Sequence, residues 1–139
     1  MKGTVVAIRL NVGSRAPLEP ADRATAVTGA GLQGDRHSRP GGRRQVLLVE
    51  EEVLGRLGLG PGAVREQITV RGVPLDSLTE GGRLRLGAAI VEVREMCEPC
   101  SRMDEIRSGL RVELEGRRGR FVHVVQGGDI AVGDPIEAL

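Results

Sequence analysis

The 139-residue sequence has almost no aromatic side chains: Phe121 is the only one, and tryptophan and tyrosine are absent. Its core must therefore be aliphatic, and it lacks the stacking platforms with which proteins bind single-stranded nucleic acid. The formal net charge is only +1, so no overall field would attract a nucleic acid either. We expect no nucleic-acid partner.

Lysine is also nearly absent, since Lys2 is the only one among 20 lysine and arginine residues. Pyridoxal phosphate forms a Schiff base with a lysine placed in a pocket, and the second residue of a chain is poorly placed for that role. We therefore do not expect pyridoxal phosphate on this chain. Arginine supplies all the other cationic side chains, and its planar guanidinium group suits bidentate binding of phosphate and other oxyanions.

Long apolar runs are missing as well, so no segment is expected to span a membrane and no membrane partner is expected. Arg9 and Asn11 interrupt the apolar N-terminal segment, which is not typical of a signal peptide. With only two cysteines, the chain fits the cytoplasm, where disulfides are rare. We expect a cytoplasmic location.

Turn-forming residues are abundant, with 21 glycines and 7 prolines, which favours short strands over a helix bundle. The segments Gly82–Gly87 and Gly128–Gly133 share the pattern G-x-aliphatic-x-aliphatic-G, as in small barrels that turn sharp corners. The length fits a single domain over residues 1–139. We predict a mostly β fold: a small closed or partly closed β-barrel with about two short helices.

Hydrophobic patterning places the individual elements. The clearest helix is expected at residues 50–57, where Gly58 can cap the C-terminus, and weaker helical spacing runs through residues 101–115. Alternation in the first strand places four apolar residues on one face: Val6, Ile8, Leu10 and Val12. Strands are expected at residues 3–12, 24–28, 45–49, 66–70, 82–87, 89–96, 120–125, 129–132 and 135–139.

Both cysteines lie in the stretch Val91–Arg102, where an expected strand ends at Pro99. Proline has a fixed φ and no N–H donor, so the ladder stops there. Cys97 is the last residue that can belong to the strand, and we expect it to be packed and inert. Cys100 lies beyond the proline at a possible helix start, which together with neighbouring arginines favours a thiolate. We predict that Cys100 is the reactive thiol.

Other interpretations of the two cysteines are weaker. A thioredoxin-type redox pair would follow the first strand of an alternating βα pattern, and that alternation is missing. A zinc site could in principle use Cys97, Cys100, His37 and His123, but the histidines are far apart in sequence and lack the usual spacing. We expect no stoichiometric zinc. A cysteine can also simply pack as a small hydrophobe.

Three turns are rich in arginine, and each could form an anion site or a solvated surface loop. Gly34–Arg44 combines cations with glycines, whose exposed backbone amides help to form an anion cradle. Arg65 and Glu66 begin an expected strand, and Arg117–Arg120 form a third cationic turn. A charged pair at a strand start can also be an ordinary surface pair. Together with a poised cysteine, the turns predict one pocket for a phosphorylated or oxyanionic ligand. Three arginines should then converge: Arg36, Arg65 and Arg118.

These motifs occur in the order seen in the MOSC family, the domains found at the C-terminus of molybdenum cofactor sulfurases. The sequence resembles that family over nearly its whole length, and the resemblance implies a barrel similar to the small barrel of pyruvate kinase. The matching motifs are Gly34-Asp35-Arg36-His37, Arg65-Glu66, Gly82-x-Leu-x-Leu-Gly87, Cys97-x-Pro99-Cys100, Arg118-Gly119 and Gly133-Asp134.

The resemblance implies a molybdenum cofactor (molybdopterin) as ligand, with Cys100 as a molybdenum ligand or sulfur carrier. Many members have asparagine where this chain has Gln67. The pyridoxal-dependent desulfurase domain of the large members is absent, so a separate cysteine desulfurase or a molybdoenzyme is the implied protein partner. The implied cofactor-binding residues are Asp35, Arg36, His37, Arg65, Glu66 and Arg118.

Three functions stay open at this point. The first is a molybdenum cofactor-binding protein for sulfur transfer or delivery to molybdoenzymes. The second is a molybdenum-dependent reductase of N-hydroxylated compounds, as some family members are, which would need a separate electron donor. The third is a structural or adaptor barrel without catalysis, whose cysteines are only packed.

Overall fold

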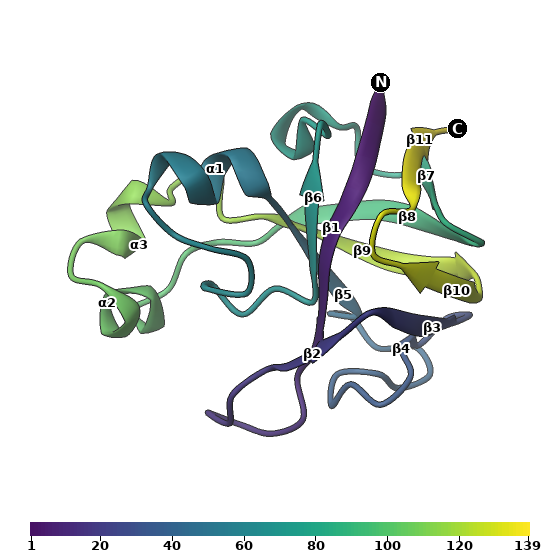
Figure 1. Cartoon of the computed structure of the whole chain (residues 1–139), viewed down its shortest axis with the longest axis horizontal. Coiled ribbons are helices and arrows are strands. Elements are labelled where there is room, and N and C mark those ends of the chain that lie inside the picture. Colours follow the sequence, from purple (N-terminus) through teal and green to yellow (C-terminus); the bar gives the residue numbers. More distant parts are fainter.

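The computed structural model describes residues 1–139 and shows a closed barrel of seven strands in a mixed sheet (Figure 1). Strand β11 pairs with β1 and closes the barrel. Strands β5 and β6 are parallel, connected by helix α1 (Glu51–Arg56), as a parallel pair requires a crossover. The barrel order is β1 (Lys2–Leu10), β6 (Ile68–Arg71), β5 (Val46–Glu50), β9 (Arg120–Gln126), β8 (Ala89–Met96), β7 (Arg83–Leu86) and β11 (Pro135–Ala138).

The predicted fold class is thus confirmed, with three short α-helices where the sequence suggested about two. A 3₁₀ turn at Leu75–Ser77 occupies the segment whose pattern was ambiguous. No helix is long and apolar enough to cross a membrane.

A second, three-stranded sheet packs against the barrel (Figure 1). It consists of β10 (Gly128–Ala131), β3 (Arg23–Val27) and β4 (Gly31–Leu32), while the short strand β2 (Glu19–Ala21) pairs with the end of β1. Strands β2 and β4 were not predicted, because they are very short and lie among turn-forming residues. The second sheet adds four side chains to the barrel core: Ala24, Ala26, Leu32 and Ile130.

The predicted face of the first strand was wrong in part. The pairing of β1 with β6 shifts register between Val5 and Ala7, which is a β-bulge. The extra residue changes the alternation, so Val5 and Ile8 are both buried in the barrel core, whereas Val6 is only half-buried. Val12, expected on the same face, lies beyond the strand and is exposed.

Strand β5 is buried on both faces and separates two cores. Val46 and Leu48 belong to the barrel core, while Leu47 and Val49 face a second cluster formed with the helices. Helices α2 (Arg102–Ile106) and α3 (Leu110–Glu113) lie with α1 beside this face of the sheet (Figure 1). The helical segment expected at residues 101–115 is split into α2 and α3, and Gly109, with φ of 85°, begins the second helix. The helix side of this cluster consists of Val53, Leu54, Val64, Met103, Leu110 and Leu114.

A buried arginine fixes the end of β8, the strand that leads to the cysteines. The Arg120 Nε atom donates to the Arg94 carbonyl at 2.6 Å, and Nη1 donates to the carbonyls of Leu75 and Leu78 at 3.0 and 2.8 Å. These bonds fall where β8 is irregular, between Val93 and Met96. The segment that follows is therefore anchored to the barrel just before Cys97.

Candidate functional site

A cavity of about 600 Å³ brings the cysteine stretch and the three arginine-rich turns together. We call it the cysteine cavity. Arg36, Arg65 and Arg118 all line it with Cys100, although they come from four separate segments of the chain. Its cationic lining comprises Arg36, His37, Arg43, Arg44, Arg65, Arg102 and Arg118, and the rest of the wall is formed by Asn11, Leu47, Gln67, Glu95, Met96, Cys97, Glu98, Cys100, Met103 and Phe121.

The positive charge in this cavity is mostly uncompensated. Arg36, Arg65 and Arg102 form no ion pair with any carboxylate, whereas Arg43 lies 3.5 Å from Glu95. Partial burial lowers the pKa of Arg65, and the like charges of Arg102 and Arg36 lower it further. Guanidinium groups that outnumber the two carboxylates of the lining, Glu95 and Glu98, favour an anionic ligand.

Arg118 is the most deeply placed of these cations, with 7% of its surface exposed. Its Nη2 atom donates to the Val64 carbonyl at 2.7 Å, but Nη1 is buried and has no hydrogen-bond partner. A buried donor without a partner is unfavourable and rare in native proteins. Because Arg118 lines the cavity, a small rotation of its side chain would present Nη1 to an oxyanion bound there.

The glycine that follows Arg118 is required by its surroundings. Gly119 has φ of 130°, and a Cβ atom there would lie 2.6 Å from the Leu48 carbonyl oxygen. Its own carbonyl accepts the Cys97 N–H at 2.9 Å. The Arg118-Gly119 motif thus lets this turn pack against β5, and it connects the buried arginine to the cysteine segment.

Asp35 does not line the cavity and instead holds together the segments around it. Its buried carboxylate accepts the backbone N–H groups of Asn11 at 2.6 Å and His37 at 3.0 Å, and the Gln67 side-chain amide at 3.3 Å. The end of β1, the cationic loop and the start of β6 are thereby connected. The role that this geometry supports for Asp35 is positioning of Arg36 and His37.

Glu66 does not line the cavity either. Its Oε2 atom accepts the Gly62 N–H at 2.8 Å and the Thr69 hydroxyl at 2.7 Å, while Oε1 is buried without a partner. These bonds hold the turn that presents Arg65, whose φ of 65° is unusual for a residue other than glycine. We assign Glu66, like Asp35, a supporting position next to an arginine.

Gln67, unlike Asp35 and Glu66, does line the cavity. Its Oε1 atom accepts the Leu47 N–H at 2.9 Å, so its amide connects β5 to Asp35. The side chain is 6% exposed, and its amide is used for these internal bonds.

The two cysteines differ in burial. Cys97 is half-buried, packs against the helix-side core and keeps its backbone paired with Gly119. Burial raises the pKa of the Cys97 thiol, and the positive charges of Arg118 and Arg44 only partly offset this effect. Cys100 is exposed and lies just before Ser101, the N-cap of α2. The helix start is present as expected, although α2 is only five residues long.

Only one of the two histidines lines the cavity. His37 lines the cysteine cavity, whereas His123 is on β9, where its Nε2 atom is 2.7 Å from the Arg43 carbonyl oxygen. No group of three or more histidine, cysteine, aspartate or glutamate side chains is arranged to hold a metal ion. A metal in this cavity would have to bring most of its ligands with it, as a metal in an organic cofactor does.

Several lining residues could not be assigned from the sequence. Asn11 and Met103 belong to segments with no site-like pattern, and Phe121 was notable only as the single aromatic residue. The Arg44 guanidinium lies 5.6 Å from the centre of the Phe121 ring, a cation–π contact on the cavity wall. Only the fold brings these residues to the site.

The fold and the site therefore define a small β-barrel with a cationic cavity beside a Cys-x-Pro-Cys segment. The sequence pattern of the MOSC domain matches residues 35–137, and the chain belongs to the MOSC domain family. No curated protein sequence gives a significant match.

Solved structures show the same fold. The YuaD protein from Bacillus subtilis superposes with a TM-score of 0.83 at 22% identity, over 99% of this chain and 96% of that one. YiiM from Geobacillus stearothermophilus gives 0.79 at 20% identity, over 99% and 75%. YiiM from Escherichia coli gives 0.76 at 17% identity, over 100% and 70%.

Proposed function

We propose that this protein binds a molybdopterin-type cofactor in the cysteine cavity and acts in sulfur transfer or cofactor delivery to molybdoenzymes. The arginines hold the phosphate of the cofactor, and Cys100 acts as a molybdenum ligand or as the sulfur carrier. The observation that carries the proposal is the buried, unpartnered Nη1 atom of Arg118 in the same cavity as Cys100.

The dimensions and donors of the cavity fit such a ligand. Its volume of about 600 Å³ is in the range that accommodates a small organic cofactor. Arg36, Arg65, Arg102 and Arg118 supply charge-assisted donors for a phosphate, and Cys100 offers one soft ligand. One thiolate cannot hold a metal alone, which agrees with a metal that arrives within an organic ligand.

In the sulfur-carrier role, the Cys100 thiolate attacks the outer sulfur of a persulfide on a donor protein. A new S–S bond forms at Cys100, the S–S bond of the donor breaks, and the donor leaves as a thiolate. The chain has no lysine in a position to hold pyridoxal phosphate, so the donor would be a separate cysteine desulfurase. The exposed position of Cys100 makes its sulfur accessible to such a partner.

Expression in a host that makes molybdopterin tests the proposal. The purified protein should contain molybdenum and pterin in equal amounts, and Arg118→Met should lose both. Arg117→Met is the matched control, because Arg117 neighbours Arg118 but lies outside the cavity and donates to the Glu113 carbonyl. Wild-type protein that carries neither component, from a host shown to contain the cofactor, would refute the proposal and favour an adaptor barrel.

A further inference from the structure

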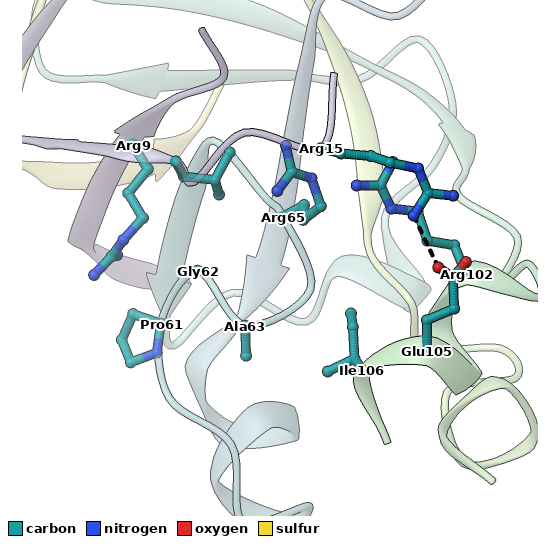
Figure 2. A pocket seen from close by; sticks show the side chains of 10 residues that line it. Arg9, Arg15, Pro61, Gly62, Ala63, Arg65, Arg102, Glu105 and Ile106 are labelled. Carbon is teal, nitrogen blue, oxygen red and sulfur yellow. Dashed lines mark hydrogen bonds and ion pairs between the residues drawn. The ribbon is translucent and has the colours of Figure 1, made fainter. Parts of the chain in front are cut away.

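A second cavity of about 510 Å³ opens beside the cysteine cavity and is also rich in arginine (Figure 2). We call it the outer cavity. Four arginines line it, Arg9, Arg15, Arg65 and Arg102, with Glu105 as its only carboxylate. Leu18, Ala63 and Ile106 supply apolar wall, so the cavity combines excess positive charge with a small hydrophobic surface.

The two cavities share a wall. Arg65 and Arg102 line both of them, and burial together with the nearby charges of Arg102 and Arg36 lowers the pKa of Arg65. Arg65 reaches this place from a left-handed backbone conformation, held by the turn that Glu66 supports. Arg65 thus has a strained backbone that the turn holds in place. From its position between the two cavities, its side chain can contact ligand groups in either one.

Arg9 and Arg15 line only the outer cavity, and contacts with neighbouring residues hold each of them in position. Arg9 lies across Gly62, where a Cβ atom would be 2.6 Å from the Arg9 Cδ atom, so the glycine makes room for its side chain. Arg9 has no ion-pair partner. Arg15 is paired with Glu105 at 2.8 Å, which joins the loop after β1 to helix α2 at the edge of the cavity (Figure 2).

We propose that the ligand of this protein carries two linked phosphate groups, one in each cavity, with Arg65 and Arg102 contacting both. The ligand class is thus a diphosphate-linked molecule, whose remaining part lies against the apolar wall of the outer cavity. The inference rests on the proposed function in one respect, that the cysteine cavity holds a phosphate. Without ligand, Glu105 forms an ion pair with Arg15, and the second phosphate displaces Glu105 from Arg15 when the ligand binds.

The probes are inorganic pyrophosphate and inorganic orthophosphate, with affinity measured by calorimetry at matched ionic strength. Wild-type protein should bind pyrophosphate roughly tenfold or more tightly than orthophosphate, since one added charge-assisted contact has that effect. The double variant Arg9→Ala/Arg15→Ala should lose most of this preference and keep its orthophosphate affinity. The control is Arg23→Ala/Arg85→Ala, which removes the same charge from two exposed residues outside both cavities.

A substitution that strengthens pyrophosphate binding provides a second test, because a misfolded variant would lose affinity and not gain it. Glu105→Gln removes the competitor of the second phosphate and should strengthen pyrophosphate binding several-fold, with orthophosphate binding little changed. Equal binding of the two probes to wild-type protein would overturn the inference. A preference for pyrophosphate that survives Arg9→Ala/Arg15→Ala, or that falls equally in the control, would overturn it as well.

Failure of this inference is distinguishable from failure of the proposed function. Retention of molybdenum and pterin without any preference for pyrophosphate refutes the two-phosphate ligand alone. A preference that depends on Arg9 and Arg15, in a protein that never retains molybdenum, supports the diphosphate site and refutes the molybdenum role. Absence of binding for both probes refutes the phosphate site in either cavity.

Discussion

Replacement of Arg118 by methionine separates ligand binding from folding. Methionine keeps an unbranched, flexible side chain, but it removes the buried charge and all the guanidinium donors. Because Nη1 has no partner in the protein, its removal breaks no internal hydrogen bond. Only the bond to the Val64 carbonyl is lost.

Two opposing contributions determine how Arg118→Met changes the free energy of unfolding. The lost charge-assisted bond to the Val64 carbonyl contributes about 1.5–3 kcal/mol, while removal of an unsatisfied buried donor returns about 1–3 kcal/mol. The two effects largely cancel, so the stability of the unliganded variant should lie within about 2 kcal/mol of that of the wild type. Its phosphate affinity should fall by about 1.5–3 kcal/mol, roughly 10- to 150-fold, because a charge-assisted contact is lost.

Urea unfolding without ligand and calorimetric titration with phosphate provide the two measurements, and Arg117→Met is again the control. A large loss of stability, with phosphate affinity unchanged, would show that Arg118 is a structural cation and would refute the reasoning. A further readout is the alkylation of Cys97, whose ionisation Arg118 favours. It should become slower in Arg118→Met.

Three further predictions concern the thiols, a glycine and one carboxylate. Cys100→Ser should abolish most alkylation at neutral pH with little change in melting temperature, whereas Cys97→Ser should mainly lower the melting temperature; equal reactivity of the two thiols would contradict this. Gly119→Ala should cost roughly 2–4 kcal/mol in urea unfolding, from backbone strain and overlap with β5, against about 1 kcal/mol for Gly116→Ala, which has open space around it. Burial and neighbouring carboxylates raise the pKa of Glu50 above its ordinary 4.5, so stability falls as the pH rises between the two values. Glu50→Gln should raise the melting temperature at neutral pH but not at pH 4, and an equal effect at both would exclude titration as the cause.

The sequence predicts the barrel because its signals are local. Short alternating runs between glycine-rich turns specify strands, and the two G-x-aliphatic-x-aliphatic-G segments do form β7 and β10. The bulge in β1 has no such signal, because both faces of that strand are apolar and only the pairing with β6 decides the register. Strands β2 and β4 are too short to have a recognisable period.

The site was less accessible to sequence reasoning. Arginine-rich turns can be recognised locally, but spacing alone cannot show that Arg36, Arg65 and Arg118 line one cavity. The carboxylates of Asp35 and Glu66 are a clear example, since their motifs single them out and their geometry directs them to protein donors instead. Whether a charged residue contacts a ligand or supports one that does depends on side-chain direction, which the fold determines.

The most direct measurement is anomalous diffraction at the molybdenum absorption edge, from crystals of protein purified from a host that makes molybdopterin. We expect a single molybdenum peak in the cysteine cavity next to the Cys100 Sγ atom, with phosphate density at the Arg118 guanidinium group. A molybdenum peak outside this cavity, or a cofactor whose phosphate lies away from Arg118, would contradict this expectation.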